Sequence, residues 1–300
     1  MAFLGVLLPI FFIFGIGYIG QKWIRFETKT LSKMALNLMS PFLVFRTFYH
    51  NELTIDYLYI FLYTFLLCFS LIAVVYLIGW LKRYSAQETC GIVLASAFMN
   101  NGNYGTPLVL FVYGTAGLHY AIVLMVIQQL VMCTVGVYYA AKGSVHVSGF
   151  QEVLRQVVRM PIVYGAMCGI IFQLFSIPLS KPMLQSINLV ADATIPTIMI
   201  ILGMQLAKIT VKRLSWEKLS LSLMIRLCLS PIIAFVLTLI FPIPDLLKKI
   251  MILMAAMPTA ANTTMYAIQY ETEPEFVSGA TLLSTNFSLV TLPVILLLLS

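Results

Sequence analysis

The sequence predicts an all-α membrane protein with ten transmembrane helices, arranged as two inverted five-helix repeats whose fourth and ninth helices are broken and cross. Three observations lead to this fold class. Of 300 residues, 61% are hydrophobic and only 10% are charged, and the mean hydropathy is +0.97, whereas a soluble domain carries about 25% charged residues. Two polar, helix-breaking clusters interrupt apolar stretches, one in each half of the chain. Lys and Arg residues lie mostly in short segments between those stretches.

Apolar stretches of about 20 residues, the length that crosses a bilayer, recur along the chain. The first has no basic residue before it and no small-residue cleavage site, so it is expected to remain as a span and not to act as a signal peptide. The spans are expected at residues 3–21, 31–49, 57–81, 88–113, 117–141, 159–177, 183–207, 217–241, 247–270 and 276–299.

The basic residues of the loops predict the orientation. The loops on one side of the membrane hold only three of the basic residues, Lys181, Lys248 and Lys249, and the loops on the other side hold many more. Basic loops face the cytoplasm, so both termini are expected to be extracellular, in a multi-pass protein of the cell (plasma) membrane. The loops assigned to the cytoplasm contain Lys22, Arg25, Lys29, Lys33, Lys82, Arg83, Lys142, Arg155, Arg159, Lys208, Lys212, Arg213 and Lys218.

A basic loop divides the chain into a first five-helix repeat at 1–141, a cytoplasmic linker at 142–158 and a second repeat at 159–300. Because five is odd, the second repeat enters the membrane upside down, as in many secondary transporters. Sequence echoes, in which the same residue type recurs roughly 150 positions later in the second half, agree with this division. They pair Pro9 and Gly17 with Pro161 and Gly169, Pro41 with Pro196, and Pro107 with Pro258.

The two polar clusters are residues 100–107 and 257–264. Irregular backbone at membrane depth persists only where it is buried in protein or lines a cavity, because lipid offers no hydrogen-bond partners. Two breaks at corresponding places therefore indicate a transporter's binding site. Simple proline kinks are the alternative interpretation, but a kink does not account for three Asn, two Gly and one Pro within the first cluster.

The breaks are expected to present helix N-termini. Thr106 followed by Pro107 is a favourable helix start, and either Asn262 or Thr259 is expected to cap the helix after the second break. Two converging N-termini favour an anion. The expected substrate-binding residues are Asn100, Asn101, Asn103, Tyr104, Thr106, Pro107, Pro258, Asn262 and, in the last span, Asn286.

Further polar residues lie within spans. Asp192 and Arg226 are expected either to form a structural ion pair or to couple ions to transport, because unpaired charges are costly in a membrane. Arg46, near the end of a span, is expected to extend to the interface. The remaining polar positions are expected to line a cavity or join helices, and they are Gln128, Gln129, Ser284, Thr285 and Ser288.

Several function classes are disfavoured. The five Cys residues include no CxxC pair, and the three His residues are scattered, so no metal, disulfide framework or cofactor is expected. No catalytic Ser/His/Asp group or HExxH motif is present, so an enzyme is not expected. The basic residues form no cluster with interleaved aromatics, so nucleic acid is not an expected partner.

Residues 100–107, the run 255–264 and the closing segments Ser284–Thr285 and Thr291–Pro293 resemble the auxin efflux carrier family. Its bacterial members include proposed malate and malonate permeases, and its plant members are the PIN carriers. The resemblance covers essentially the whole chain. It implies a fold similar to that of bile acid:sodium symporters, with spans 1, 2, 6 and 7 as a scaffold and spans 3–5 and 8–10 as a transport domain. It also implies that Pro107, Pro258, Asn101 and Asn262 support a carboxylate-bearing substrate.

The function expected from these observations is secondary transport of a small organic anion by elevator-like alternating access. A non-transporting membrane receptor or sensor with a transporter fold is the alternative. The sequence leaves open the coupling ion, H⁺ or Na⁺, the identity of the carboxylate, the direction of transport and whether the scaffold helices form a homodimer.

Overall fold

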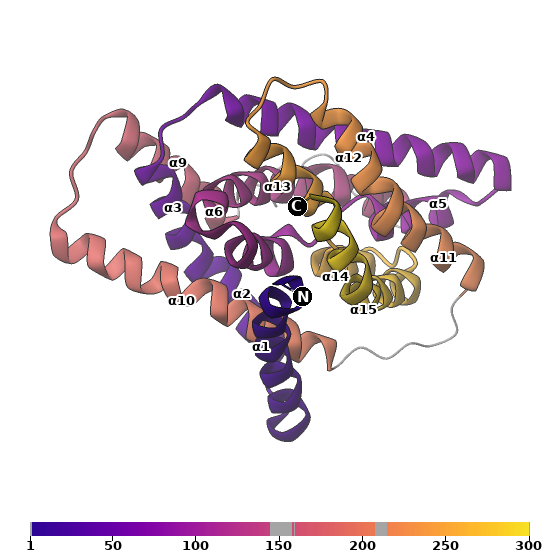
Figure 1. Ribbon diagram of the computed structural model, residues 1–300. Helices are drawn as coiled ribbons and strands as arrows, with labels where there is room; N and C mark the ends of the chain where they lie inside the picture. The colour runs from indigo at the N-terminus through magenta and orange to yellow at the C-terminus, as the bar shows by residue number, and fades with distance from the viewer. Residues whose placement is uncertain (1, 145–157, 159, 208–214, 300) are drawn as a thin grey trace. The chain divides into compact units, whose positions relative to one another are not determined.

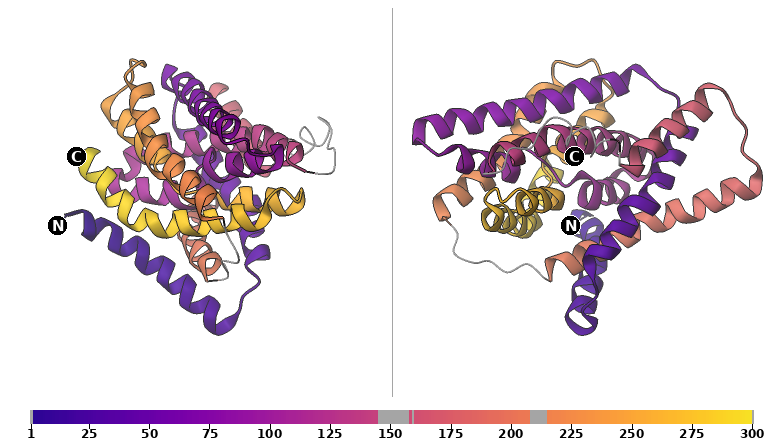
Figure 2. Two further views of the ribbon diagram at one scale, coloured as in Figure 1. Left: turned by 90° about the vertical axis from the view of Figure 1, so that its right-hand side faces the viewer. Right: turned by 180° about the vertical axis from the view of Figure 1, so that it is seen from behind.

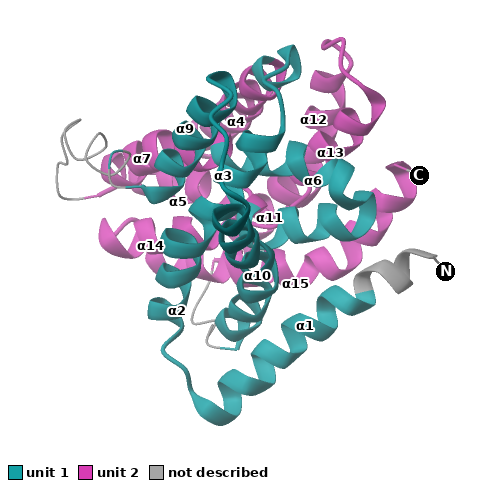
Figure 3. Cartoon of the chain, turned by 90° about the vertical axis from the view of Figure 1, so that its left-hand side faces the viewer, with its two compact units in different colours: residues 1–58, 102–126, 158–208 teal, residues 59–101, 127–157, 209–300 magenta. Residues whose placement is uncertain are grey.

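The computed structural model describes residues 2–144, 158, 160–207 and 215–299, and within these ranges the chain is all-helical, without a β-strand (Figure 1). Most of the predicted linker at 142–158 lies outside the described residues. The contacts divide the chain into two compact units, coloured separately in Figure 3. Unit 1 comprises residues 1–58, 102–126 and 158–208, and unit 2 comprises residues 59–101, 127–157 and 209–300.

Five helical stretches in the described ranges are long and apolar enough to cross a membrane, judged by length and composition. They are α4 (Ile55–Lys82), Asn101–Lys142, α10 (Lys181–Leu206), Trp216–Thr238 and α15 (Pro274–Leu299). Figure 2 shows α4 and α15 as long continuous helices. Two shorter apolar helices, Leu8–Ile24 and Pro161–Leu174, accompany them. The all-α class is thus confirmed, while ten spans in two inverted repeats stay a prediction.

Unit 1 contains α1 (Ala2–Ile24), α2 (Thr28–Met34), the π-helix η1 (Ala35–Met39), α3 (Ser40–His50), α9 (Pro161–Leu174), α10 and most of α6 (Thr106–Val131). The backbone of α6 is not helical at Gly114, where φ is 66° and ψ is −160°. A positive φ is readily adopted only by glycine. The chain therefore turns sharply at the place where the sequence predicts the fourth span to end and the fifth to begin.

Glycines bring the helices of unit 1 into backbone contact. A Cβ atom on Gly17 of α1 would lie 2.0 Å from the carbonyl oxygen of Ile200 in α10, and one on Gly169 of α9 would lie 2.7 Å from that of Phe45 in α3. Gly17 and Gly169 are an echoed pair in the sequence, and Phe45 and Ile200 have the same separation as Pro41 and Pro196. Two glycines related by the sequence echo thus contact two residues that have a similar separation, while the inverted repeat itself stays a prediction.

Unit 2 contains most of α4, α5 (Ala86–Ser96), the end of α6, η3 (Met132–Gly136), α7 (Val137–Lys142), α11 (Trp216–Met224), η4 (Ile225–Leu229), α12 (Ser230–Thr238), α13 (Asp245–Ala255), α14 (Ala261–Gln269) and α15. α5 packs on α7, α11, α14 and α15. The last turn of α5 and residues 250–255 at the end of α13 are buried. Their ends therefore lie in the core of unit 2.

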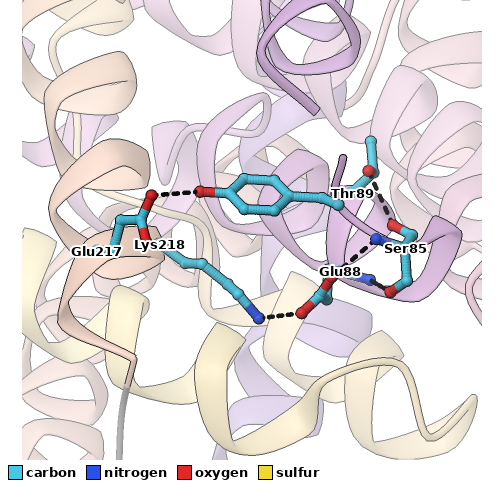
Figure 4. A network of polar contacts seen from close by, with 6 residues as sticks. Ser85, Glu88, Thr89, Glu217 and Lys218 are labelled. Carbon is cyan, nitrogen blue, oxygen red and sulfur yellow. Dashed lines mark hydrogen bonds and ion pairs between the residues drawn. The ribbon is translucent and has the colours of Figure 1, made fainter. Parts of the chain in front are cut away.

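A polar network fixes the beginning of α5 (Figure 4). The Ser85 hydroxyl accepts the Glu88 N–H at 3.2 Å, and the Glu88 carboxylate accepts the Ser85 N–H at 2.7 Å, which completes a capping box. Lys218 of α11 donates to the same carboxylate. Burial, together with the nearby Glu217 carboxylate, raises the pKa of Tyr84, so the phenol stays protonated and donates to Glu217 at 3.2 Å.

Candidate functional site

The two polar clusters meet in unit 2 through their backbones. Met99 and Thr259 form an antiparallel bridge. The Asn100 N–H donates to the Pro258 carbonyl at 2.8 Å, and the Ala260 N–H donates to the Phe98 carbonyl at 3.0 Å. Each break thus supplies hydrogen-bond partners that the other lost on leaving the helix, which is the condition for irregular backbone at membrane depth.

Pro258 explains why the second helix stops. Proline has no N–H and disfavours helical geometry in the residue before it, and α13 ends at Ala255, three residues earlier. Side chains then hold the extended segment. The Thr259 N–H donates to the Ser284 hydroxyl of α15 at 3.0 Å, and the Thr259 hydroxyl donates to the Ala95 carbonyl in the last turn of α5.

The helix after the second break, α14, starts without a side-chain cap. Its N-cap residue is Ala260, so the prediction that Thr259 or Asn262 caps it is wrong. The physical reason is that the Thr259 hydroxyl is taken by Ala95, while Asn262 lies within the first turn. No side chain of the described residues therefore covers the first-turn N–H groups of α14, and these groups form the positive end of its dipole.

Asn262 is half-buried at this N-terminus. Its side-chain amide donates to the Gln129 side-chain oxygen at 3.4 Å. Gln129 also donates to Cys133 Sγ at 3.5 Å, and Cys133 lies 2.9 Å from the Tyr266 hydroxyl. The result is a row of neutral polar groups that runs from the second break along α14.

The helix after the first break also begins differently from the prediction. A π-helical turn, η2 (Asn101–Gly105), runs directly into α6, so Thr106 and Pro107 continue a helix and do not start one. The Thr106 hydroxyl points to Met125 Sδ, 3.6 Å away. The Thr-Pro pair does not start the helix, because the Asn- and Gly-rich segment before it is itself helical.

The remaining predicted residues of the first break differ in burial. Asn100 and Asn101 are buried, with exposed fractions of 5% and 2%, and Tyr104 is buried with its ring 5.3 Å from that of Phe14. Asn103 is half-buried. The unit boundary falls between Asn101 and Gly102, so Asn103, Tyr104, Thr106 and Pro107 belong to unit 1. Convergence of both N-termini on one ligand accordingly stays a prediction.

Asn286 does not lie at the second break. It is exposed on α15, whereas Ser284, two residues earlier, is fully buried and contacts Thr259. Residues two apart on a helix point in very different directions. Ser284 is therefore the residue of α15 that holds the break, and the Asn286 side chain takes no part in holding it.

Asp192 and Arg226, expected either to form an ion pair or to couple ions, have different partners. Asp192 accepts from Arg46 at 2.6 Å, so Arg46 pairs with it instead of simply extending to the interface. Both residues line a pocket of about 370 Å³ in unit 1, together with His50 and His119. The Asp192 side chain is 70% exposed, a setting in which ion pairs contribute little.

Arg226 lies in unit 2 and is fully buried. Its guanidinium donates to the carbonyl of Ser96 at 2.9 Å, to the carbonyl of Ala255 and to the hydroxyl of Ser230. All of these partners are neutral. Since Ser96 and Ala255 are the last residues of α5 and α13, Arg226 joins the two helices that end at the breaks.

Comparison with known proteins decides the family. A family model described as "Membrane transport protein" matches residues 2–296. The chain belongs to this family. It is the auxin efflux carrier family that the sequence resembles. An uncharacterized transporter of Methanothermobacter thermautotrophicus is 26% identical over 93% of this chain and 90% of its own length. An uncharacterized transporter of Methanocaldococcus jannaschii is 25% identical over 88% of this chain and 87% of its own length.

This member of the membrane transport protein family is thus a multi-pass membrane protein. Sequence reasoning found its polar clusters but missed how they are held. Ser284 was expected to line a cavity or join helices, and Ser230 was not singled out at all. Nothing in a sequence shows that Ser96 and Ala255 contribute only their carbonyl groups. The one available signal was Arg226 itself, since a lone Arg in an apolar span needs buried acceptors.

Proposed function

We propose that this protein is a secondary carrier of a small organic anion bearing a carboxylate, with its binding site at the two helix breaks. The observation that supports this most strongly is the uncapped N-terminus of α14, which lies beside the backbone bridge and is flanked by the amides of Asn262 and Gln129. Helix N-termini and neutral amides bind carboxylates through N–H donors.

Transport is proposed to proceed by elevator-like movement, in which the two bridged helix breaks move between the two sides of the membrane. Three features fit a moving site. The bridge supplies its own backbone partners, the helix ends are held by α15 and Arg226, and all of these groups belong to unit 2. The site would thus keep its shape while its access changes.

The test is counterflow of labelled dicarboxylates and aromatic monocarboxylates into proteoliposomes. We expect saturable exchange of at least one carboxylate, reduced about tenfold or more by Asn262→Ala, because a hydrogen bond to a charged group contributes roughly 1.5–3 kcal/mol. Asn286→Ala is the matched control, since this amide is exposed on α15 and is expected to leave exchange unchanged. Equal loss in both variants would contradict the proposed site, and folded protein that exchanges no anion would favour a receptor.

A further inference from the structure

The surroundings of Arg226 are unusual for a buried charge. Its side chain is fully buried in the π-helical turn η4, between α11 and α12. π-turns within α-helices occur frequently at functional sites. In the part of the chain that the structure describes, all its hydrogen-bond acceptors are neutral oxygens, namely the carbonyls of Ser96 and Ala255 and the hydroxyl of Ser230. A positive charge is thus buried without an acidic partner in hydrogen-bond contact.

Helix dipoles supply the missing negative charge. Ser96 ends α5 and Ala255 ends α13. The C-terminus of a helix carries roughly half a negative charge on its unpaired carbonyls. Two such ends amount to about one negative charge, which matches one guanidinium. The Ser230 hydroxyl donates to the Ala255 carbonyl at 2.8 Å and so completes the arrangement.

The three oxygens that accept from Arg226 are of the type that binds alkali-metal ions in proteins. Sodium ions in transporters are bound by unwound backbone carbonyls and by the C-terminal ends of half-helices, and hard cations prefer oxygen ligands in general. Here the carbonyl oxygens come from the last residues of α5 and α13, the two helices that lead into the breaks. A side-chain cation already contacts them. A sodium ion bound to these oxygens would be repelled by the Arg226 guanidinium, which carries the same sign of charge and is hydrogen-bonded to the same oxygens.

We propose that Arg226 is a resident cation that takes the place of a coupling sodium ion at the ends of α5 and α13. It holds the two breaks together in every step of the cycle, and this site needs no sodium. The statement about transport rests on the proposed function, whereas the statement about cation binding and stability does not. Arg226 is on this account a positioning residue, since its contacts are with the helix ends.

The first experiment measures thermal unfolding of the purified protein in detergent, with choline, sodium or guanidinium as the chloride salt. The unaltered protein is expected to unfold at the same temperature in choline and in sodium. Arg226→Ala is expected to lower that temperature by about 5–10 °C, as expected when one partner of a buried polar arrangement is removed. Millimolar guanidinium or sodium is expected to restore part of the loss in a saturable manner, because it refills the vacated position.

Two further variants keep the test decisive. Arg226→Lys retains a cation and is expected to unfold between the unaltered protein and Arg226→Ala, and it serves as the probe if the alanine variant does not fold. Arg46→Ala removes an arginine whose partner is the carboxylate of Asp192, and it is expected to show no response to guanidinium.

Sodium-dependent stabilisation of the unaltered protein would overturn the proposal. So would an Arg226→Ala variant that is as stable as the unaltered protein and indifferent to cations. Because unfolding is measured without substrate, these results stand whether or not carboxylate exchange is found. Where exchange is found, it is expected to be equal in sodium and choline for the unaltered protein, and exchange that requires sodium would contradict the claim about coupling.

Discussion

The helix crossings of unit 1 and those of unit 2 are held by different forces. In unit 1, α1 meets α10 and α3 meets α9 at glycines, so backbone atoms touch and contribute dispersion contacts along regular helices. In unit 2, the segments that follow α5 and α13 meet at extended residues joined by backbone hydrogen bonds, a serine and a buried guanidinium.

The difference shows what each unit is suited to do. A glycine contact between two intact helices has no polar group left for a ligand, because the helices satisfy their own backbones. A crossing of broken helices exposes helix ends, and every polar group there needs a partner or a ligand. The first arrangement suits a rigid support and the second suits a binding site.

The largest effect is expected from adding a methyl group at a glycine crossing. Gly17→Ala places a Cβ 2.0 Å from the Ile200 carbonyl oxygen, so α1 and α10 have to separate, at a cost of about 3 kcal/mol or more. The matched control is Gly15→Ala, where no described atom outside the local turn of α1 lies within 4 Å of the new Cβ. Thermal unfolding in detergent should show a clear loss for Gly17→Ala alone, and equal stability of the two variants would refute the close contact.

A smaller effect is expected where a side chain supports the break. Ser284→Ala leaves the buried Thr259 N–H without its acceptor, which should lower the free energy of unfolding by about 1–3 kcal/mol. Thr285→Val is the control, because among the described residues the Thr285 hydroxyl donates within its own helix, to the Thr281 carbonyl. Chemical denaturation of the purified variants measures both. If Thr285→Val costs as much as Ser284→Ala, the serine does not act on the break.

The smallest effect is expected at the exposed ion pair. Asp192→Asn removes the charge that Arg46 contacts, but the Asp192 side chain is 70% exposed, so the loss should stay below about 1 kcal/mol. Denaturation of Asp192→Asn, Arg46→Ala and the double variant gives the coupling energy directly. Carboxylate exchange that collapses in Asp192→Asn while stability is kept would instead assign Asp192 a role in ion coupling.

The sequence predicted features that depend on local composition. Proline and the Asn-Gly clusters mark the interruptions, and the glycine echoes mark residues that make equivalent contacts in unit 1. Prediction from the sequence failed where a residue far away in the chain decides which group a side chain binds. Either Asn262 or Thr259 was expected to cap α14, but the Thr259 hydroxyl donates to the Ala95 carbonyl, more than 160 positions away in the sequence.

Charge and amide positions failed for a related reason. An ion pair between Asp192 and Arg226 was one expectation, because unpaired charges are costly in a membrane. That cost does not show which neighbour a side chain faces. Asn286 was expected among the substrate-binding residues, yet its neighbours Ser284 and Ser288, four residues apart, lie on the buried face of α15 and leave Asn286 exposed. The helix face on which a residue lies and the partner that it contacts are both set by the folded chain.

The most direct test of the central claim is equilibrium binding of a labelled carboxylate that the protein exchanges. Binding to the purified protein should weaken about tenfold or more in Asn262→Ala, at the N-terminus of α14, and stay unchanged in Asn286→Ala, on the exposed face of α15. Unchanged affinity in Asn262→Ala, in protein that unfolds at the normal temperature, would place the carboxylate away from the helix breaks and contradict the account.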